Sequence, residues 1–184
     1  MGISDEILAD YIIAPDPQAA RLSRQVSGQD ETGARVSLNV VEERPLTIYL
    51  NAQEIVTAMT IGDYPEYLAL GFLANQGMLS AADDVSAVDF DDELDVVVVR
   101  TSDATRAEVN LDKKTRTSGC AVGSVFGDMM AGLEGLRLPE LTCDVSALYT
   151  LSHKINRTPS LYLEAGAIHG TVLCQGDRPL VYME

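Results

Sequence analysis

A strand–turn–strand pattern near residue 50 places the strongest constraint on the fold of this chain. Residues 46–50 and 54–60 are rich in β-branched and aromatic side chains, and Asn51-Ala52 separates the two runs. Two such runs joined by a short turn are typical of an antiparallel hairpin. We therefore expect a β-hairpin over residues 46–60.

A helix is predicted directly after this hairpin, from about Tyr64 to Gln76. Asp63 and Glu66 lie three positions apart with Pro65 between them, which predicts a capping box at the start of the helix. Gly77 is expected to cap its end. The apolar side chains of this segment are Leu68, Leu70, Phe72, Leu73 and Met78.

Hydrophobic periodicity predicts the other elements. The expected strands are 94–100, 106–111, 160–163, 168–174 and 180–183, with a turn over 175–178. The expected helices are 121–135 and 145–154. The mixture predicts a protein of the α+β class.

Two changes in composition predict the domain organisation. Residues 1–35 are polar without a sustained period, so we expect a flexible leader with at most one short strand at its end. A basic, glycine-rich stretch begins after Asp112. We therefore predict an N-terminal α+β domain over 36–112 and a second domain over 113–184.

Charge and cysteine content exclude several classes of protein. The formal net charge of -15 disfavours broad binding to nucleic-acid phosphates, although a local basic pocket for one small anion stays open. The longest uncharged run through an apolar region, residues 67–82, is shorter than a membrane span and contains Asn75 and Gln76. No secretory leader precedes Arg21, and three widely spaced cysteines fit a reducing cytoplasm.

An acidic stretch over residues 83–95 allows two interpretations. It contains Asp83, Asp84, Asp89, Asp91, Asp92, Glu93 and Asp95, with no basic residue among them. We favour a solvated edge and turn over a metal or partner site.

Cys120 is the best candidate for a reactive side chain. It lies between Gly119 and Gly123 at the start of the predicted helix, where the helix dipole favours a thiolate. Lys113, Lys114 and Arg116 lie just upstream, in a region (100–116) that holds 5 of the 13 basic residues. A buried structural cysteine beside a solvated basic strand end is the equally open alternative.

The other candidate residues carry weaker signals. Cys143 precedes a helix beside Asp144, whose negative charge disfavours a thiolate, and Cys174 lies in an apolar strand typical of core. His169 follows Gly166 near a strand end, which suits either a structural role or a binding site. The His-x-Glu and Pro-Cys-x-x-Cys elements of zinc deaminases are missing, so no zinc or other metal is expected.

Five segments in order resemble the formate dehydrogenase accessory sulfurtransferase family, FdhD. They are Glu43–Ile48, Met59–Val85, Thr117–Met130, Ala165–Leu173 and Gly176–Glu184, and together the match covers about Val41 to Glu184. The resemblance implies a small α/β-roll-like N-terminal domain followed by a partial cytidine-deaminase-like α/β domain.

The resemblance also implies a function. Family members are cytoplasmic and pass sulfur from a cysteine desulfurase to the molybdenum bis-molybdopterin-guanine-dinucleotide cofactor before it enters formate dehydrogenase. The sulfur travels as a persulfide on the first loop cysteine, which falls on Cys120. Lys113, Lys114, Arg116, Gly119, Gly123 and His169 are then expected to bind the cofactor. A homodimer is expected.

Three departures from the family pattern affect this expectation. Gly123 stands where many members have a second cysteine, and Ala165-Gly166-Ala167 replaces Thr-Gly-Gly before His169. Members also continue beyond the position of Glu184, so a truncated chain with impaired cofactor handling is expected. The alternatives are a cofactor-binding chaperone without sulfur transfer and, less favoured, a thiol-redox protein.

Overall fold

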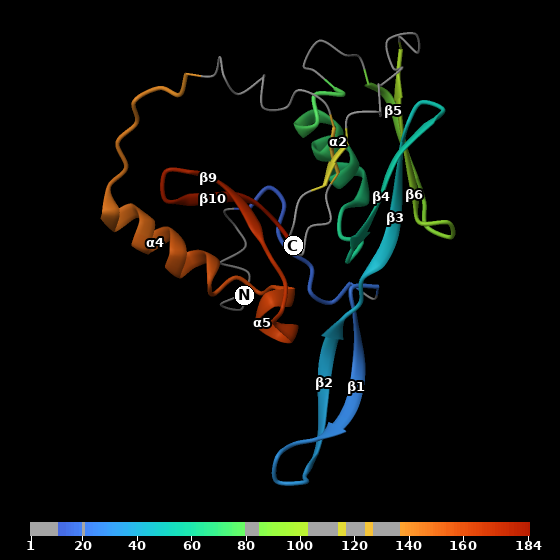
Figure 1. Cartoon of the computed structure of the whole chain (residues 1–184). Helices are drawn as coiled ribbons and strands as arrows, with labels where there is room; N and C mark the ends of the chain where they lie inside the picture. The colour runs from blue at the N-terminus through green and yellow to red at the C-terminus, as the bar shows by residue number, and fades with distance from the viewer. Residues whose placement is uncertain (1–10, 20, 80–84, 103–113, 117–123, 127–136) are drawn as a thin grey trace. The chain divides into compact units, whose positions relative to one another are not determined.

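The computed structural model of the chain combines short helices with several small sheets (Figure 1). It describes residues 11–19, 21–79, 85–102, 114–116, 124–126 and 137–184. Contacts divide the chain into two compact units, one formed by residues 1–43 and 139–184 and the other by residues 44–138. We call them the terminal unit and the central unit. This mixed content agrees with the predicted α+β class.

A four-stranded sheet organises the central unit. Its strands are β3 (Arg44–Leu50), β4 (Gln53–Thr60), β5 (Val85–Asp91) and β6 (Val96–Thr101), in the order β4-β3-β6-β5. β3 and β4 pair antiparallel across the turn at Asn51, which has φ 54°, and this confirms the predicted hairpin. β3 and β6 are parallel, so the chain must cross over between them.

Helix α2 (Pro65–Asn75) forms this crossover and covers one face of the sheet (Figure 1). Alternating strand residues place their apolar side chains toward the helix. The resulting buried cluster consists of Leu46, Ile48, Leu50, Ile55, Ala69, Leu73, Leu79, Val97 and Val99. This cluster is the core of the central unit.

The prediction for the start of α2 is wrong, and the prediction for its end is confirmed. The start is not the predicted capping box, because Tyr64 is the N-cap in the left-handed region (φ 45°), without a side-chain cap. A residue before proline is disfavoured in the helical region, so Pro65 starts the helix one residue later than predicted. At the other end, Gly77 has φ 68°, and the amides of Gly77 and Met78 bond the carbonyls of Ala74 and Leu73. The predicted glycine cap is therefore confirmed.

Part of the acidic stretch forms the edge strand β5. At least one of its carboxylates has a basic partner, because Arg100 Nε on β6 lies 2.9 Å from Asp89 Oδ2. Asp91 ends the strand and accepts the amides of Glu93 and Leu94, which closes the turn to β6. Residues 85–95 therefore form the expected solvated edge and turn, and the edge is a strand paired with β6. Asp83 and Asp84 lie outside the described residues.

Strands β7 (Lys114–Arg116) and β8 (Ser124–Phe126) form a separate antiparallel pair. β8 falls inside the helix predicted over 121–135, so that prediction is wrong for residues 124–126. Pairing of Arg116 with Ser124 satisfies the backbone across strands rather than along a helix. The rest of that predicted helix, and the predicted strand over 106–111, lie outside the described residues.

The terminal unit begins with structure in the segment predicted as a leader. β1 (Ser23–Gln29) pairs antiparallel with β2 (Arg35–Val41), and Ile13 forms a parallel bridge with Val181. Residues 11–35 therefore include a full strand and a long-range bridge, which a loosely ordered leader would lack. The bridge depends on a distant partner that a local sequence window does not contain, whereas β1 and β2 form a local hairpin that the sequence analysis did not predict.

The rest of the terminal unit packs helix against sheet. Its elements are α4 (Val145–Ile155), α5 (Leu161–Ala165), β9 (Thr171–Gln175) and β10 (Arg178–Met183). The predicted helix over 145–154 and the strand over 180–183 are confirmed, and the turn between β9 and β10 has Gly176 at φ 62°. The predicted domain boundaries at 35 and 112 differ from the divisions between these compact units and stay predictions.

The strand predicted over 160–163 is wrong, because these residues begin helix α5. Ser160 is its N-cap, and its hydroxyl accepts the Leu163 amide. The carboxylate of Glu184 accepts the amides of Leu161 and Tyr162 at 2.6 and 2.9 Å. The anion that completes this helix start comes from a residue more than twenty positions away, which no local pattern reveals.

Candidate functional site

The predicted carrier cysteine lies in the segment that links β7 to β8. Cys120, Gly119, Gly123 and Lys113 fall outside the described residues. Lys114 and Arg116 are the first and last residues of β7, and the Arg116–Ser124 pair closes the strand pairing nearest to this segment. The cysteine is thus flanked by a paired strand on each side in sequence.

This setting changes the argument for a reactive thiol at Cys120. Residues 124–126 form a strand, so they do not extend a helix whose N-terminal amides would favour a thiolate. The concentration of positive charge upstream of Cys120 is unaffected. A lowered pKa at Cys120 stays a prediction that rests on cationic neighbours alone.

The second candidate region is the five-residue connection from α5 to β9, which contains His169. We call residues 166–170 the His169 loop. It was predicted as strand from Ile168 on, but β9 begins only at Thr171. Gly166 has φ 64° and ψ -168°, a conformation open to glycine, and Ala167 has φ 53°. His169 is exposed.

A set of buried hydroxyl groups lies beside this loop. Thr158 and Ser160 are 0% and 1% exposed. The Tyr11 hydroxyl lies 2.8 Å from Thr158 Oγ1, which itself donates to the Lys154 carbonyl, so Tyr11 must be the donor. Tyr182 is 5% exposed, and burial raises the pKa of its phenol above the usual 10.0, although a hydrogen bond with Ser160 opposes this. At neutral pH Tyr182 is therefore a neutral hydroxyl.

Sequence reasoning did not single out Tyr11 or Tyr182. Tyr11 belongs to the segment interpreted as a leader, and Tyr182 belongs to a predicted strand without a motif around it. Simple alternation along β10 would not place both of its buried residues, Pro179 and Tyr182, on one face, because they lie three positions apart; a register shift between Pro179 and Val181 interrupts the alternation. The contact between these tyrosines, with ring centroids 6.5 Å apart, joins residues far apart in sequence.

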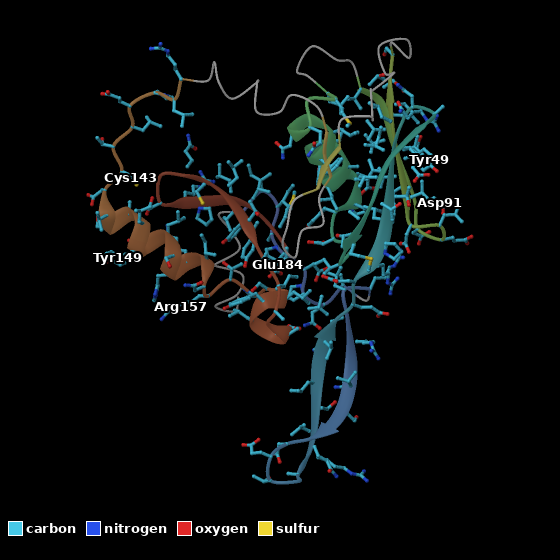
Figure 2. The ribbon with its side chains drawn as sticks, viewed as in Figure 1. Tyr49, Asp91, Cys143, Tyr149, Arg157 and Glu184 are labelled. Atoms are coloured by element: carbon cyan, nitrogen blue, oxygen red, sulfur yellow. The ribbon has the colours of Figure 1, made fainter. Side chains whose placement is uncertain are left out.

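The other two cysteines have settings that suit a carrier thiol poorly. Cys174 lies in β9, its thiol donates to the Val172 carbonyl at 3.6 Å, and burial raises its pKa. Cys143 is exposed at the start of α4, where Figure 2 labels it. It lies beside Asp144, which is negative because the Ser146 amide and hydroxyl lower the pKa of the carboxyl.

In the part of the chain that the structure describes, no group of three or more His, Cys, Asp or Glu residues is arranged to hold a metal ion. None of the helices in the described ranges is long and apolar enough to cross a membrane.

Comparison with known proteins assigns the family. The sequence model of the FdhD/NarQ family matches residues 41–184, which is most of the chain. The chain therefore belongs to the FdhD/NarQ family, and the resemblance drawn from the sequence motifs is confirmed. The matched range includes both Cys120 and His169.

Curated relatives carry the name sulfur carrier protein FdhD. The protein from Listeria monocytogenes is 26% identical over 149 residues, covering 78% of this chain and 56% of the relative. The protein from Bacillus subtilis is 26% identical over 156 residues, covering 80% and 57%. The protein from Bordetella parapertussis is 30% identical over 132 residues, covering 72% and 45%. The chain thus spans about half the length of these relatives.

A solved structure shares the fold. It is the crystal structure of a protein from Desulfotalea psychrophila that was assigned as a formate dehydrogenase accessory protein. The two superpose with a TM-score of 0.61 at 18% identity, covering 87% of this chain and 59% of the other. At this identity the likeness establishes the arrangement of elements, and function has to be argued from the site.

Proposed function

We propose that this chain is a sulfur carrier that supports formate dehydrogenase, with Cys120 as the thiol that carries the sulfur. In this proposal a cysteine desulfurase is the donor, and the molybdenum bis-molybdopterin-guanine-dinucleotide cofactor is the acceptor substrate. Transfer takes place in the cytoplasm. The homodimer expected from the family stays a prediction.

The loading step needs a thiolate and no external oxidant. The Cys120 thiolate attacks the outer sulfur of the desulfurase persulfide, a new S–S bond forms on Cys120, and the S–S bond on the desulfurase breaks. The desulfurase cysteine leaves as a thiolate, so electrons and atoms balance. Passing the outer sulfur onward regenerates the Cys120 thiolate, and conversion of that sulfur to sulfide takes two electrons from the acceptor cofactor.

Family membership over residues 41–184 is the observation that carries this proposal. The cysteines themselves support the choice of Cys120. Burial raises the pKa of Cys174, and a negative carboxylate stands beside Cys143. Cys120 has five basic residues upstream of it between Arg100 and Arg116, which favours a thiolate.

A complementation experiment tests the proposal. A bacterial strain that lacks its own FdhD protein receives the wild-type chain or one of the variants Cys120→Ala, Cys143→Ala and Cys174→Ala, and formate dehydrogenase activity is measured. We expect loss of activity only for Cys120→Ala, because the other two thiols do not carry sulfur. A persulfide-specific label on the protein incubated with desulfurase and cysteine should likewise disappear only in that variant.

The outcomes separate the two candidate functions. Full activity of Cys120→Ala would exclude sulfur transport through this residue and would favour a cofactor-binding chaperone. If the wild-type chain itself fails to complement, the same substitutions are made at the matching cysteine of the Bacillus subtilis relative. Persulfide labelling of the chain then decides whether it accepts sulfur.

A further inference from the structure

We propose that Tyr182 is a positioning residue for His169, acting through the backbone of Gly170. The inference rests on the proposed function and on the expectation, implied by the family resemblance, that His169 binds the cofactor. Tyr182 itself does not reach the ligand in this proposal. Its buried ring packs against Gly170, the last residue of the His169 loop.

The close approach of Gly170 to Tyr182 carries the argument. A Cβ atom added to Gly170 would stand 2.6 Å from Tyr182 Cε2, 3.2 Å from Cζ and 3.1 Å from the hydroxyl oxygen. Real Cβ atoms do not approach other heavy atoms to 2.6 Å. Position 170 therefore accepts only glycine while the ring stays in place, and the reason is space rather than backbone φ.

The ring of Tyr182 cannot easily move aside. Its side chain is 5% exposed, its backbone amide donates to the Ile13 carbonyl at 3.0 Å, and its ring lies against the ring of Tyr11. Tyr11 is in turn held by its bond to the buried Thr158 hydroxyl. In a close-packed interior such a group transmits strain to its neighbours instead of absorbing it.

The other end of the His169 loop is fixed as well. Gly166 ends α5 with φ 64°, and its amide bonds the Tyr162 carbonyl. Ala167 follows with φ 53°, an arrangement that non-glycine residues adopt only when their surroundings impose it. His169 thus stands between two constrained backbone positions and one tight ring contact, which limits the backbone conformations open to the His169 loop.

The chain offers a direct reporter for this geometry, because it has two histidines. His153 lies on α4, away from the His169 loop in sequence, and serves as the internal control. The ring signals of both are followed by NMR in the wild-type chain and in Gly170→Ala. We expect the His169 signal to shift or broaden and the His153 signal to stay unchanged.

Substitutions at Tyr182 test whether the ring is the cause. Tyr182→Phe keeps the Cε2 and Cζ atoms, so the wild-type His169 signal should persist in this variant. Tyr182→Leu lacks both atoms, so Gly170→Ala introduced into that background should move the His169 signal much less than in the wild-type background. A double-mutant cycle of this kind isolates the contact between the two residues.

Three results would overturn the proposal. The first is a His169 NMR signal that does not change in Gly170→Ala. The second is an equal change on Gly170→Ala in the wild-type and Tyr182→Leu backgrounds. The third is a change of the His169 signal in Tyr182→Phe as large as that in Gly170→Ala. The last would assign the effect to the hydroxyl instead. If Gly170→Ala fails to fold, the His169 signal of Tyr182→Leu alone decides, since removal of the ring should shift it.

Complementation links the geometry to function. Gly170→Ala should lower formate dehydrogenase activity, whereas Gly71→Ala, whose added Cβ meets no atom within 4 Å, is the matched control and should keep it. Loss of the proposed function would appear as full activity of Cys120→Ala, whereas failure of the positioning role would appear as an unshifted His169 signal. The two failures are therefore distinguishable.

Discussion

The central unit buries apolar side chains from three strands and a helix in one cluster, whereas the terminal unit buries fewer apolar side chains and adds specific polar contacts between distant residues. In the central unit, β3, β4, β6 and α2 supply the cluster. In the terminal unit, the fully buried side chains include two hydroxyl residues, Thr158 and Ser160. Large apolar side chains of α4, α5 and β9 stay exposed, namely Val145, Leu148, Tyr149, Tyr162, Leu163 and Leu173.

The two units differ in the kind of interaction that stabilises them. Burial of apolar area stabilises without regard to direction, so the central unit depends on volume and tolerates polar change at its surface. Hydrogen bonds are directional and cost most when one partner is removed, so the terminal unit depends on particular atoms. The candidate ligand residue His169 lies in the unit of the second kind.

The largest stability effect is expected in the apolar cluster. Leu73 on α2 is 0% exposed, so Leu73→Ala leaves a cavity and should cost about 2–5 kcal/mol of unfolding free energy. Urea denaturation followed by circular dichroism measures the loss. Leu68→Ala is the matched control on the same helix, because Leu68 is 39% exposed. A similar cost for both variants would contradict the packing argument.

The next largest stability effect is expected in the terminal unit, where the carboxylate of Glu184 accepts two backbone amides of α5. Glu184→Ala removes the carboxylate that accepts the Leu161 and Tyr162 amides, at a cost of about 1.5–3 kcal/mol. Hydrogen exchange of these two amides measures the change. Glu164→Ala is the control, since it removes an exposed bond from Gln18 at the other end of α5. Equal protection of both amides in wild type and Glu184→Ala would refute the prediction.

A smaller effect of opposite sign is expected at Ala167. Its φ of 53° costs a residue with a Cβ about 1–2 kcal/mol, and the extra freedom of glycine in the unfolded chain offsets about 0.4–1 kcal/mol of that. Ala167→Gly should therefore raise the urea midpoint slightly. Ala165→Gly, within α5, should lower it. A lower midpoint for Ala167→Gly would show that the left-handed conformation is not imposed in solution.

The smallest effect concerns the exposed start of α4. Hydrogen bonds from the Ser146 amide and hydroxyl lower the pKa of Asp144 below 3.8 in the folded chain. The cap therefore stabilises fully above pH 3.8, and this stabilisation is lost as pH falls through the lower folded value. Exchange of the Ser146 amide should increase over that acidic window. Asp144→Asn keeps an acceptor without a charge and should show no such step.

The candidate site could be predicted only in part. The motifs around Cys120 and His169 were sufficient to indicate the family, which the match over residues 41–184 confirms. Glycine-rich sequence before Val125 also led to a predicted helix, but residues 124–126 pair with β7 instead. A three-residue strand carries too few side chains to show a period of two, so sequence alone cannot distinguish it.

Sequence by itself determined the features that depend on neighbouring residues. The hairpin at Asn51, the glycine cap at Gly77, the turn at Gly176 and helix α4 after Asp144 all follow from backbone preferences within a few positions. Tertiary structure alone decided the features that depend on distant partners. The carboxylate of Glu184 accepts the first amides of α5, and a Cβ atom at residue 170 would meet the ring of Tyr182. These choices rest on contacts across the fold, and such contacts leave no local periodicity in the chain.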